Sequence, residues 1–399
     1  MKYTMMHDIL SWTIEKDDTL QPASQDRGSH IHRSPFQTAA PPAGLRIAGH
    51  QYSARFLAGL AMLLSVVLLL ACDDNPPDAP VDPVLPPTID TTSHDFVWTV
   101  DTIGMELSWI NDVAIISEND VWVVGMFEQR GDDGRYDITK RGNAAHFDGK
   151  KWTIYNITDG TRGWGGEKRV VCAAGPGNIW MMSGGGWHFD GSRWRSLDFW
   201  SLGHKVSTLD AWVSDDLNTR IFVGPDSSLV YFKDGAYVKH LSAPGYDFNA
   251  VDGFSNGDAL IGAGKFNVGA LFRMNREGGF STVLKLSKYE IEDVSVTIHD
   301  DIVFTTRRNL YRCYGDRAIA MFETDQNIYG LKANTVNDIF IGTGSSTIYH
   351  YNGIDVKDIG PDYSGICYGM GLTATKDLVY FIAIGEMQRC LVFRGERKK

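Results

Sequence analysis

The amino-acid sequence predicts an all-β chain built from seven copies of one small sheet, and three observations support this. The chain of 399 residues carries 42 glycines and 12% aromatic residues, a composition typical of short strands and tight turns. The phrase HFDGKKWTIY from His146 returns as HFDGSRWRSL from His188 and, more loosely, as YHYNGIDV from Tyr349. A strand signal also recurs along the chain. Regular recurrence of this kind is the mark of a repeat architecture.

The strand signal is an Asp or Asn turn, then β-branched or aromatic residues, then usually glycine. Its copies are NDVWVVG, GNIWMMSG, TRIFVG, GDALIG, DDIVFTT, NDIFIG and KDLVYFIAIG. The marker residues are spaced by 37 to 58 residues and are Asp120, Asn178, Arg220, Asp258, Asp301, Asp338 and Asp377. An apolar run precedes each marker, and a hairpin such as Asp148-Gly149 follows. Four antiparallel strands in about 40 residues predict one blade of a β-propeller, and seven blades predict a ring.

The two ends of the chain predict how this ring closes. The last repeat supplies three strands and stops at RGERKK, one strand short of the others. The segment from Ser93, SHDFVWTVDTIG, reads like a fourth strand. We therefore expect residues 95–103 to complete the seventh blade, which removes exposed sheet edges.

The N-terminal region predicts export and lipid anchoring. Residues 55–71 have a basic flank and an apolar run too short to span a bilayer comfortably, as in a signal peptide. The run ends in LLAC, which has the form of a lipobox with Cys72 as the lipidated residue. Residues 72–94, rich in Pro and Asp, are expected to form an extended tether. Residues 1–54 are interpreted as a non-native or disordered extension, and residues 95–399 as the propeller.

A lipobox, a Pro/Asp tether and phrases such as FVWTVDTIG, WINDVAII and NAAHFDGKKW occur together here. In these features the chain resembles a family of uncharacterised bacterial seven-bladed β-propeller lipoproteins. The resemblance covers residues 55–399 and implies a protein anchored to a membrane of the bacterial cell envelope, facing the periplasm or the cell surface. It implies no chemistry.

Several classes of function are disfavoured. A net charge of −11 without a basic stripe argues against nucleic-acid binding. No motif for a catalytic nucleophile, a nucleotide or a metal is present, so we expect no catalytic residue, metal or cofactor. The repeated histidines His146, His188 and His350 fall in separate blades and cannot share an ion. Cys172, Cys313, Cys367 and Cys390 are placed apart by the repeats, which favours free thiols over disulfides.

The candidate ligand site lies in loops outside the repeat. The loops that join the second strand to the third, and the fourth to the next first strand, gather on one face of a propeller, and function normally lies on such loops. The long segments 126–143 and 158–169 stand out there. The candidate binding residues on this face are Trp109, Arg130, Tyr136, Lys140, Trp164, Glu167, Lys168, Trp187, His204, Tyr246 and Arg307.

Two functions of different classes follow from these residues. The first is a non-catalytic, monomeric binding or scaffold module for a protein or carbohydrate partner, because aromatic rings beside charged groups suit such ligands. The second is a polysaccharide hydrolase or lyase, which needs two carboxylates about 5 to 10 Å apart. The clustered acidic residues for it are Glu128, Asp132, Asp133 and Glu167. A redox propeller is disfavoured because its usual tryptophan docking repeats are missing.

Overall fold

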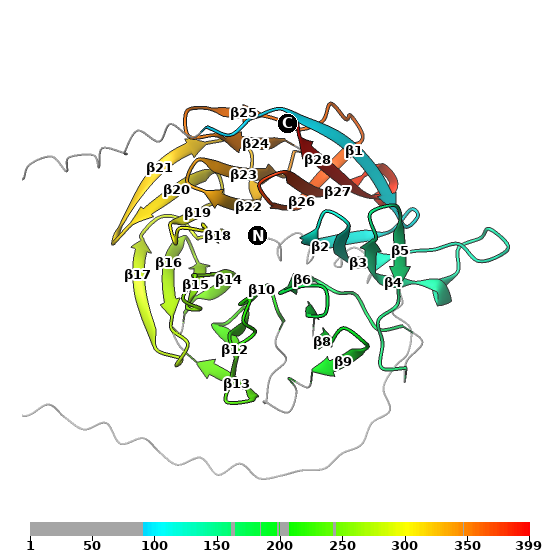
Figure 1. Ribbon diagram of the computed structural model, residues 1–399, viewed down its shortest axis with the longest axis horizontal. Helices are drawn as coiled ribbons and strands as arrows, with labels where there is room; N and C mark the ends of the chain where they lie inside the picture. The colour runs from blue at the N-terminus through cyan, green and yellow to red at the C-terminus, as the bar shows by residue number, and fades with distance from the viewer. Residues whose placement is uncertain are drawn as a thin grey trace, which may run out of the picture. The chain divides into compact units, whose positions relative to one another are not determined.

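The computed structural model describes residues 91–399, apart from 161–163, 184, 198, 200–206, 242–244 and 346. The signal peptide, Cys72, most of the tether and His204 lie outside the described residues. The described chain forms 28 strands and two short 3-10 helices, arranged as seven four-stranded antiparallel sheets in a ring (Figure 1). The predicted seven-bladed propeller is confirmed.

The blades follow one another in chain order. Blade 1 contains β2 (Trp109–Ser117), β3 (Asp120–Phe127), β4 (Gly142–Phe147) and β5 (Trp152–Tyr155). Blade 2 contains β6 (Val170–Ala173), β7 (Ile179–Met182), β8 (Gly186–Phe189) and β9 (Trp194–Leu197). Blade 3 contains β10 (Asp210–Val213), β11 (Arg220–Gly224), β12 (Ser228–Lys233) and β13 (Ala236–Leu241). Blade 4 contains β14 (Asp247–Gly253), β15 (Ala259–Lys265), β16 (Val268–Met274) and β17 (Phe280–Leu286).

The remaining blades complete the circle. Blade 5 contains β18 (Asp293–Val296), β19 (Ile302–Thr305), β20 (Asn309–Tyr314) and β21 (Arg317–Glu323). Blade 6 contains β22 (Ile328–Thr335), β23 (Asp338–Thr343), β24 (Ile348–Tyr351) and β25 (Val356–Asp358). Blade 7 contains β26 (Ile366–Ala374), β27 (Leu378–Gly385), β28 (Cys390–Arg397) and β1 (Phe96–Ile103).

The second strand of each blade carries most of the recurring strand signal, and its burial explains that signal. All four residues of β7, all six of β23 and all eight of β27 are buried. A strand with neighbouring blades against both faces needs apolar residues at every position, not only at alternate ones. The outer strands instead carry exposed residues, as in β17, where Ser281, Thr282 and Lys285 are exposed.

The N-terminal strand closes the ring as predicted. β1 pairs antiparallel with β28 from Phe96 opposite Arg397 to Ile103 opposite Cys390, and the two lie side by side in Figure 1. The two chain ends meet at this edge, where the Lys398 amide donates a hydrogen bond to the Asp95 carbonyl oxygen at 2.9 Å. The last blade is thus built from both ends of the described chain.

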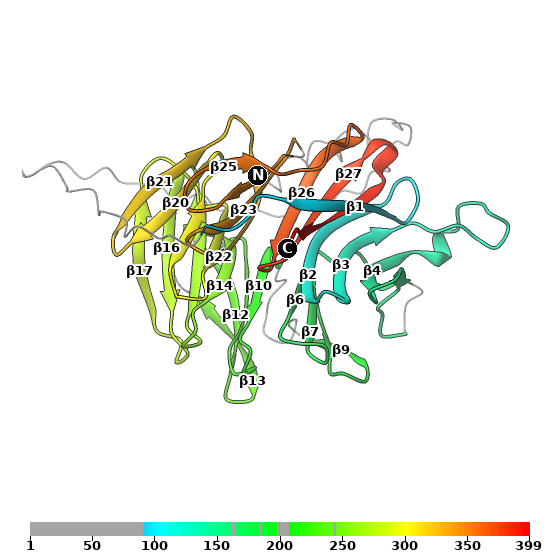
Figure 2. The same cartoon turned by 45° about the horizontal axis from the view of Figure 1, so that its top comes forward.

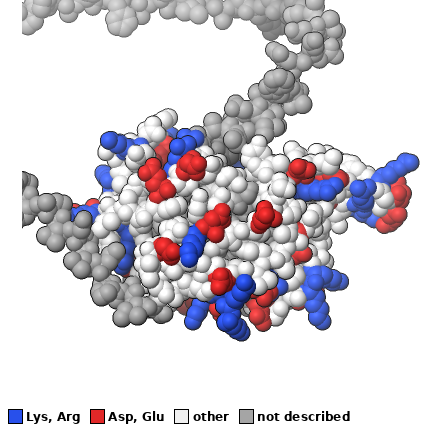
Figure 3. All heavy atoms as spheres, turned by 90° about the horizontal axis from the view of Figure 1, so that it is seen from above, with Lys and Arg blue, Asp and Glu red and all other residues white. Residues whose placement is uncertain are grey.

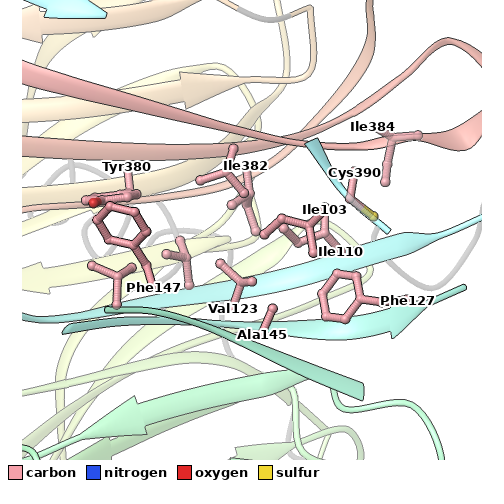
Figure 4. Packing of buried hydrophobic residues seen from close by; sticks show 13 residues of the cluster. Ile103, Ile110, Val123, Phe127, Ala145, Phe147, Tyr380, Ile382, Ile384 and Cys390 are labelled. Atoms are coloured by element: carbon pink, nitrogen blue, oxygen red, sulfur yellow. The ribbon is translucent and has the colours of Figure 1, made fainter. Parts of the chain in front are cut away.

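The interface between blades 7 and 1 is packed like a domain core. Ile103, Ile382 and Cys390 of blade 7 face Ile110 and Phe127 of blade 1, and all are at most 2% exposed (Figure 4). Similar apolar clusters fill the spaces between the other blades. Burial of this surface is the main force that holds blade against blade.

Carboxylates on the inner strands link successive blades. Their backbone N–H donors lie on the inner strand of the following blade, and the pairs are Val171 to Asp112, Val251 to Asp210, Val296 to Asp252 and Leu331 to Asp293. Each of these four carboxylates also accepts the amide of the residue that follows it. Burial raises the pKa of Asp210 well above its usual range, and the nearby Asp293 and Asp112 raise it further.

The cysteines of the described chain are free thiols. Cys367 and Cys390 lie on β26 and β28 with β27 between them, and Cys172 and Cys313 lie in blades 2 and 5. This agrees with the sequence-based expectation. Among the described residues, no helix has the length and apolar character needed to cross a bilayer.

Candidate functional site

The ring has two faces with different loops. One face carries the loops from second to third strands and from fourth strands to the next blade, and we call it the loop face. The opposite face carries the short turns from first to second and from third to fourth strands, and we call it the turn face. The described N-terminal residues lie on the turn face, where Thr92 donates a hydrogen bond to Asn337 O and His94 contacts Asp355. The chain therefore enters the propeller from the face opposite the candidate loops.

The loop between β3 and β4 extends beyond the rest of the ring (Figure 2). It is folded by its own contacts: Arg130 and Tyr136 form an isolated β-bridge, and Asp137 caps a 3-10 helix, η1 (Ile138–Lys140). The Lys140 Nζ lies 2.6 Å from Asp132 Oδ1. Lys and Arg alternate with Asp and Glu at its tip (Figure 3). Such a loop presents its side chains with part of the ordering entropy already lost.

The base of this loop holds a buried ion pair. Glu128 is 1% exposed, and its Oε1 lies 2.7 Å from Nε of Arg141. Arg141 also donates to the Tyr136 hydroxyl at 2.5 Å, and its guanidinium lies 5.4 Å from the centre of the Trp164 ring. The Glu128 carboxylate raises the pKa of Arg141. Glu128 Oε2 and Trp164 Nε1 are buried without a hydrogen-bond partner.

Lys168 lies in the next loop and is almost fully buried, at 1% exposed. Its Nζ donates to the carbonyl oxygens of Gly165 at 2.7 Å and Gly166 at 3.3 Å, and lies 5.4 Å from the centre of the Trp187 ring. Burial lowers the pKa of Lys168 to about 8. Two carbonyl dipoles and an aromatic face hold this ammonium group. Through these contacts Lys168 fixes the loop that contains Gly165 and Gly166 against Trp187.

The other predicted residues are spread around the loop face. Glu167 accepts a hydrogen bond from Asn111 at 2.7 Å. Trp109 packs against the core between blades 7 and 1, and Tyr246 packs edge-on against Phe272. Arg307 is exposed and donates to Asn327 at 2.9 Å. The structure therefore places Arg130, Tyr136 and Lys140 on one loop, with Trp164 against Arg141 at its base. Lys168 and Trp187 form a separate pair, and Tyr246 and Arg307 lie near other blades.

The repeated histidines stack on aromatic residues within their own blades. The rings of His146 and Trp122 lie 4.4 Å apart, those of His188 and Trp180 4.4 Å, and those of His350 and Phe340 4.6 Å. Trp194 of blade 2 also meets Trp122 of blade 1 edge-on, so these two tryptophans pack between neighbouring blades. No group of His, Cys, Asp and Glu in the described residues could hold a metal ion.

Sequence reasoning missed three exposed apolar residues of the loop face. Leu107 is 60% exposed, Met387 70% and Phe266 84%, and each has a positive φ, of 68°, 56° and 54°. The Leu107 amide donates to Met387 O at 3.2 Å, so these two residues lie together where blade 7 meets blade 1. Large side chains avoid this backbone region. The only signal in the sequence was an apolar residue in each of three short connections between strands, at residues 105–107, 265–267 and 386–388.

No protein-family model and no curated protein matches the chain. Solved structures do match. The structure described as YCF48 bound to D1 peptide has a TM-score of 0.56 and 10% identity, covering 77% of this chain and 100% of that one. An inactive virginiamycin B lyase variant from Staphylococcus aureus, solved with quinupristin, has a TM-score of 0.57 and 10% identity, covering 75% and 99%. The WD40 propeller domain of Doa1 has a TM-score of 0.53 and 11% identity, covering 76% and 98%. At these identities the similarity supports the fold alone.

Proposed function

We propose that this chain is a lipid-anchored propeller of the bacterial cell envelope that binds a protein or glycan partner through its loop face, without catalysis. The observation that carries the proposal is the distribution of exposed apolar side chains. Among the described loops and turns, six large exposed apolar residues lie on the loop face: Leu107, Tyr136, Phe266, Tyr289, Tyr363 and Met387. Two, Ile298 and Ile354, lie on the turn face. Of these, Leu107 and Met387 lie together where blade 7 meets blade 1, and adjacent exposed apolar groups mark interaction surfaces.

Backbone strain supports the same face. Leu107 and Met387 place large apolar side chains in solvent and in the left-handed region, which together disfavour the folded chain. Strain of this kind persists mainly where function requires it. Arg389 and Arg130 flank the pair, at 2.6 Å and 3.8 Å from the Glu106 carboxylate. An apolar centre with Met and a charged rim containing Arg is typical of protein interfaces. One propeller of similar fold was also solved with a peptide bound.

The arrangement of the acidic residues favours binding over hydrolysis. Glu128 is buried against Arg141, Asp132 is fully exposed beside Lys140, and Glu167 accepts a hydrogen bond from Asn111. These carboxylates have different partners and different degrees of exposure. A hydrolase of the usual kind instead needs one protonated and one ionised carboxylate facing each other across a substrate.

We also propose that the chain is exported and lipidated at Cys72, as the lipobox predicts. The first described residues, 91–95, contact the turn face, so the candidate binding loops lie on the opposite face of the ring from them.

The test uses the soluble body, residues 91–399, on peptide and glycan arrays. Three variants are compared with it: one lacking residues 130–140, Leu107→Ser with Met387→Ser, and Ile298→Ser with Ile354→Ser as a matched control on the turn face. We expect a specific signal that either loop-face variant reduces at least about tenfold, while the control leaves it unchanged. Arrays without signal, or a signal lost only in the turn-face control, would contradict the proposal.

A further inference from the structure

A series of side-chain contacts joins residues 91–95, which we call the N-terminal segment, to blade 6 on the turn face. His94 Nε2 lies 2.9 Å from Asp355 Oδ1, the Nδ1 atoms of His94 and His350 lie 2.9 Å apart, and His350 Nε2 lies 2.9 Å from Asp338 Oδ1. His350 and Asp338 are buried, at 0% and 2% exposed. Both carboxylates come from blade 6, and only His94 comes from the segment before β1.

The same cluster includes the last residue of β28. Arg397 Nη2 lies 2.6 Å from Asp338 Oδ1, and Arg397 Nη1 donates to the Ser93 carbonyl oxygen at 2.5 Å. Its guanidinium lies 4.9 Å from the centre of the Phe96 ring. The cluster therefore lies where the N-terminal segment, the closing edge of blade 7 and blade 6 all meet.

The hydrogen-bond geometry fixes the number of protons that the two imidazole rings carry together. An ionised carboxylate only accepts, so each Nε2 must carry a proton, and a contact between two ring nitrogens needs a single proton between them. Asp338 is held ionised: burial by itself raises its pKa, but hydrogen bonds from His350, Asn334 and Arg397 outweigh burial and lower it. Three protons on two rings give the pair one positive charge. Burial lowers the pKa of His350, which disfavours a full positive charge on that ring.

We propose that His94 and His350 form a proton-dependent latch that holds the N-terminal segment on blade 6 and releases it when the pair gains or loses a proton. A fourth proton would place N–H against N–H at the 2.9 Å contact between the rings. Loss of the third proton would leave the lone pairs of the two Nδ1 atoms facing each other, or the lone pair of one Nε2 atom facing a carboxylate. The latch is therefore closed over an intermediate pH window and opens on both sides of it.

The other charged groups around the pair do not replace this contact. Lys357 Nζ lies 3.5 Å from Asp355 Oδ2, and Arg397 already lies on Asp338. Thr92 donates its hydroxyl proton to Asn337 O at 3.1 Å, and its oxygen lies 3.2 Å from His350 Nε2 as a second acceptor. The pKa of Asp338 and that of Asp355 are both lowered, so the two carboxylates stay ionised near neutral pH, where imidazole is the kind of side chain that ordinarily changes charge.

The direct test is the protonation of the ring nitrogens, read by ¹⁵N NMR of the two histidines in the soluble body. Near neutral pH we expect both Nε2 atoms protonated and one Nδ1 proton shared between the rings. Two neutral rings, or two fully protonated rings, throughout the range from about pH 5 to pH 9 would overturn the proposal.

The second test is amide hydrogen exchange of residues 91–103, corrected for intrinsic rates. His94→Gln should fold, because His94 precedes the first strand, and should speed exchange of this segment about tenfold or more near neutral pH, as expected for lost hydrogen bonds to charged groups. Wild-type exchange should rise toward that of the variant at either pH extreme. The matched control is His146→Gln, since His146 also lies 2.9 Å from an aspartate, Asp120, but both residues of this pair belong to blade 1. Equal exchange in wild type and His94→Gln at every pH would refute the latch.

Discussion

At the scale of single residues, the repeated phrase is explained by three adjoining roles. In HFDG the histidine stacks on the aromatic residue of the second strand, as His146 does on Trp122 and His188 on Trp180, and His146 also contacts Asp120 at the start of that strand. The Asp-Gly pair then makes the hairpin turn, in which Asp148 accepts the amides of Lys150 and Lys151 and Gly149 has φ 87°. The phrase recurs in blades 1, 2 and 6 because these blades make the same stack and a tight hairpin turn.

Gly149 provides a test of this turn. A Cβ at Gly149 would lie 2.4 Å from Asn119 Oδ1, whereas one at Gly235, with φ 82°, would meet nothing within 4 Å. Gly235→Ala should therefore lower the free energy of unfolding by about 1 to 2 kcal/mol through backbone strain alone. We expect Gly149→Ala to cost about 1 kcal/mol more, measured by urea unfolding. Equal losses in the two variants would show that the contact with Asn119 is absent.

Lys168 makes the free energy of unfolding depend on pH in the alkaline range. Its pKa is lowered from 10.5 to about 8 in the folded chain, so between these values the unfolded chain binds more protons. The free energy of unfolding should therefore rise with pH from about 8 to about 10.5, by about 3 kcal/mol from this group. Lys168→Met should remove that rise, as seen in the difference between the two pH profiles. A rise of equal size in both proteins would assign it to other groups.

At the scale of elements, β1 decides whether blade 7 is complete. Its register places Ile103 opposite Cys390, and its residues Phe96 and Trp98 cover the cluster around Phe340 and Phe393. Without β1 the chain would expose the edge of β28 and part of that cluster. An exposed apolar sheet edge is a site of aggregation.

A circular permutant tests this role of β1. Because the Lys398 amide contacts Asp95 O, residues 93–103 can be moved behind Lys399 through a short linker to form a hairpin with β28. We expect this permutant, starting at Gly104, to unfold within a few degrees of the parent by calorimetry. A chain from Gly104 to Lys399 without the strand should unfold far lower or aggregate. If that shortened chain were as stable as the permutant, closure by β1 would be unnecessary.

At the scale of the whole molecule, the ring separates an entry face from a candidate binding face. Thr92 and His94 lie on turns of blade 6, while Leu107 and Met387 lie on the opposite loops. The first described residues and the candidate binding loops are therefore on opposite faces of the ring.

The proposed anchoring is tested at Cys72. Expressed in a bacterial host, the full chain should appear in the membrane fraction with a mass increase from its acyl chains, since more than one chain gives stable attachment. Cys72→Ser should appear in the soluble exported fraction with no such increase. Cys313→Ser is the control and should leave membrane attachment unchanged. A wild-type chain without added mass would refute lipidation at this residue.

The sequence by itself determined the number of blades, their strands and the closing strand, because each is a local and repeated requirement. The strand signal indicates burial on both faces, and Asp-Gly indicates a tight turn. The fourth strand that the last repeat lacks corresponds to the extra strand that precedes the first repeat. The candidate loops could also be found, as departures from the repeat.

Only the tertiary structure decided which side chains of those loops meet. Trp109 and Lys168 are candidates in sequence, yet one packs into a core and the other is buried on carbonyl oxygens. Leu107 and Met387, nearly 300 positions apart, come together only because the ring closes. Periodicity encodes local geometry, whereas contacts between loops of different blades depend on how the whole ring closes, and no local pattern of residues records that.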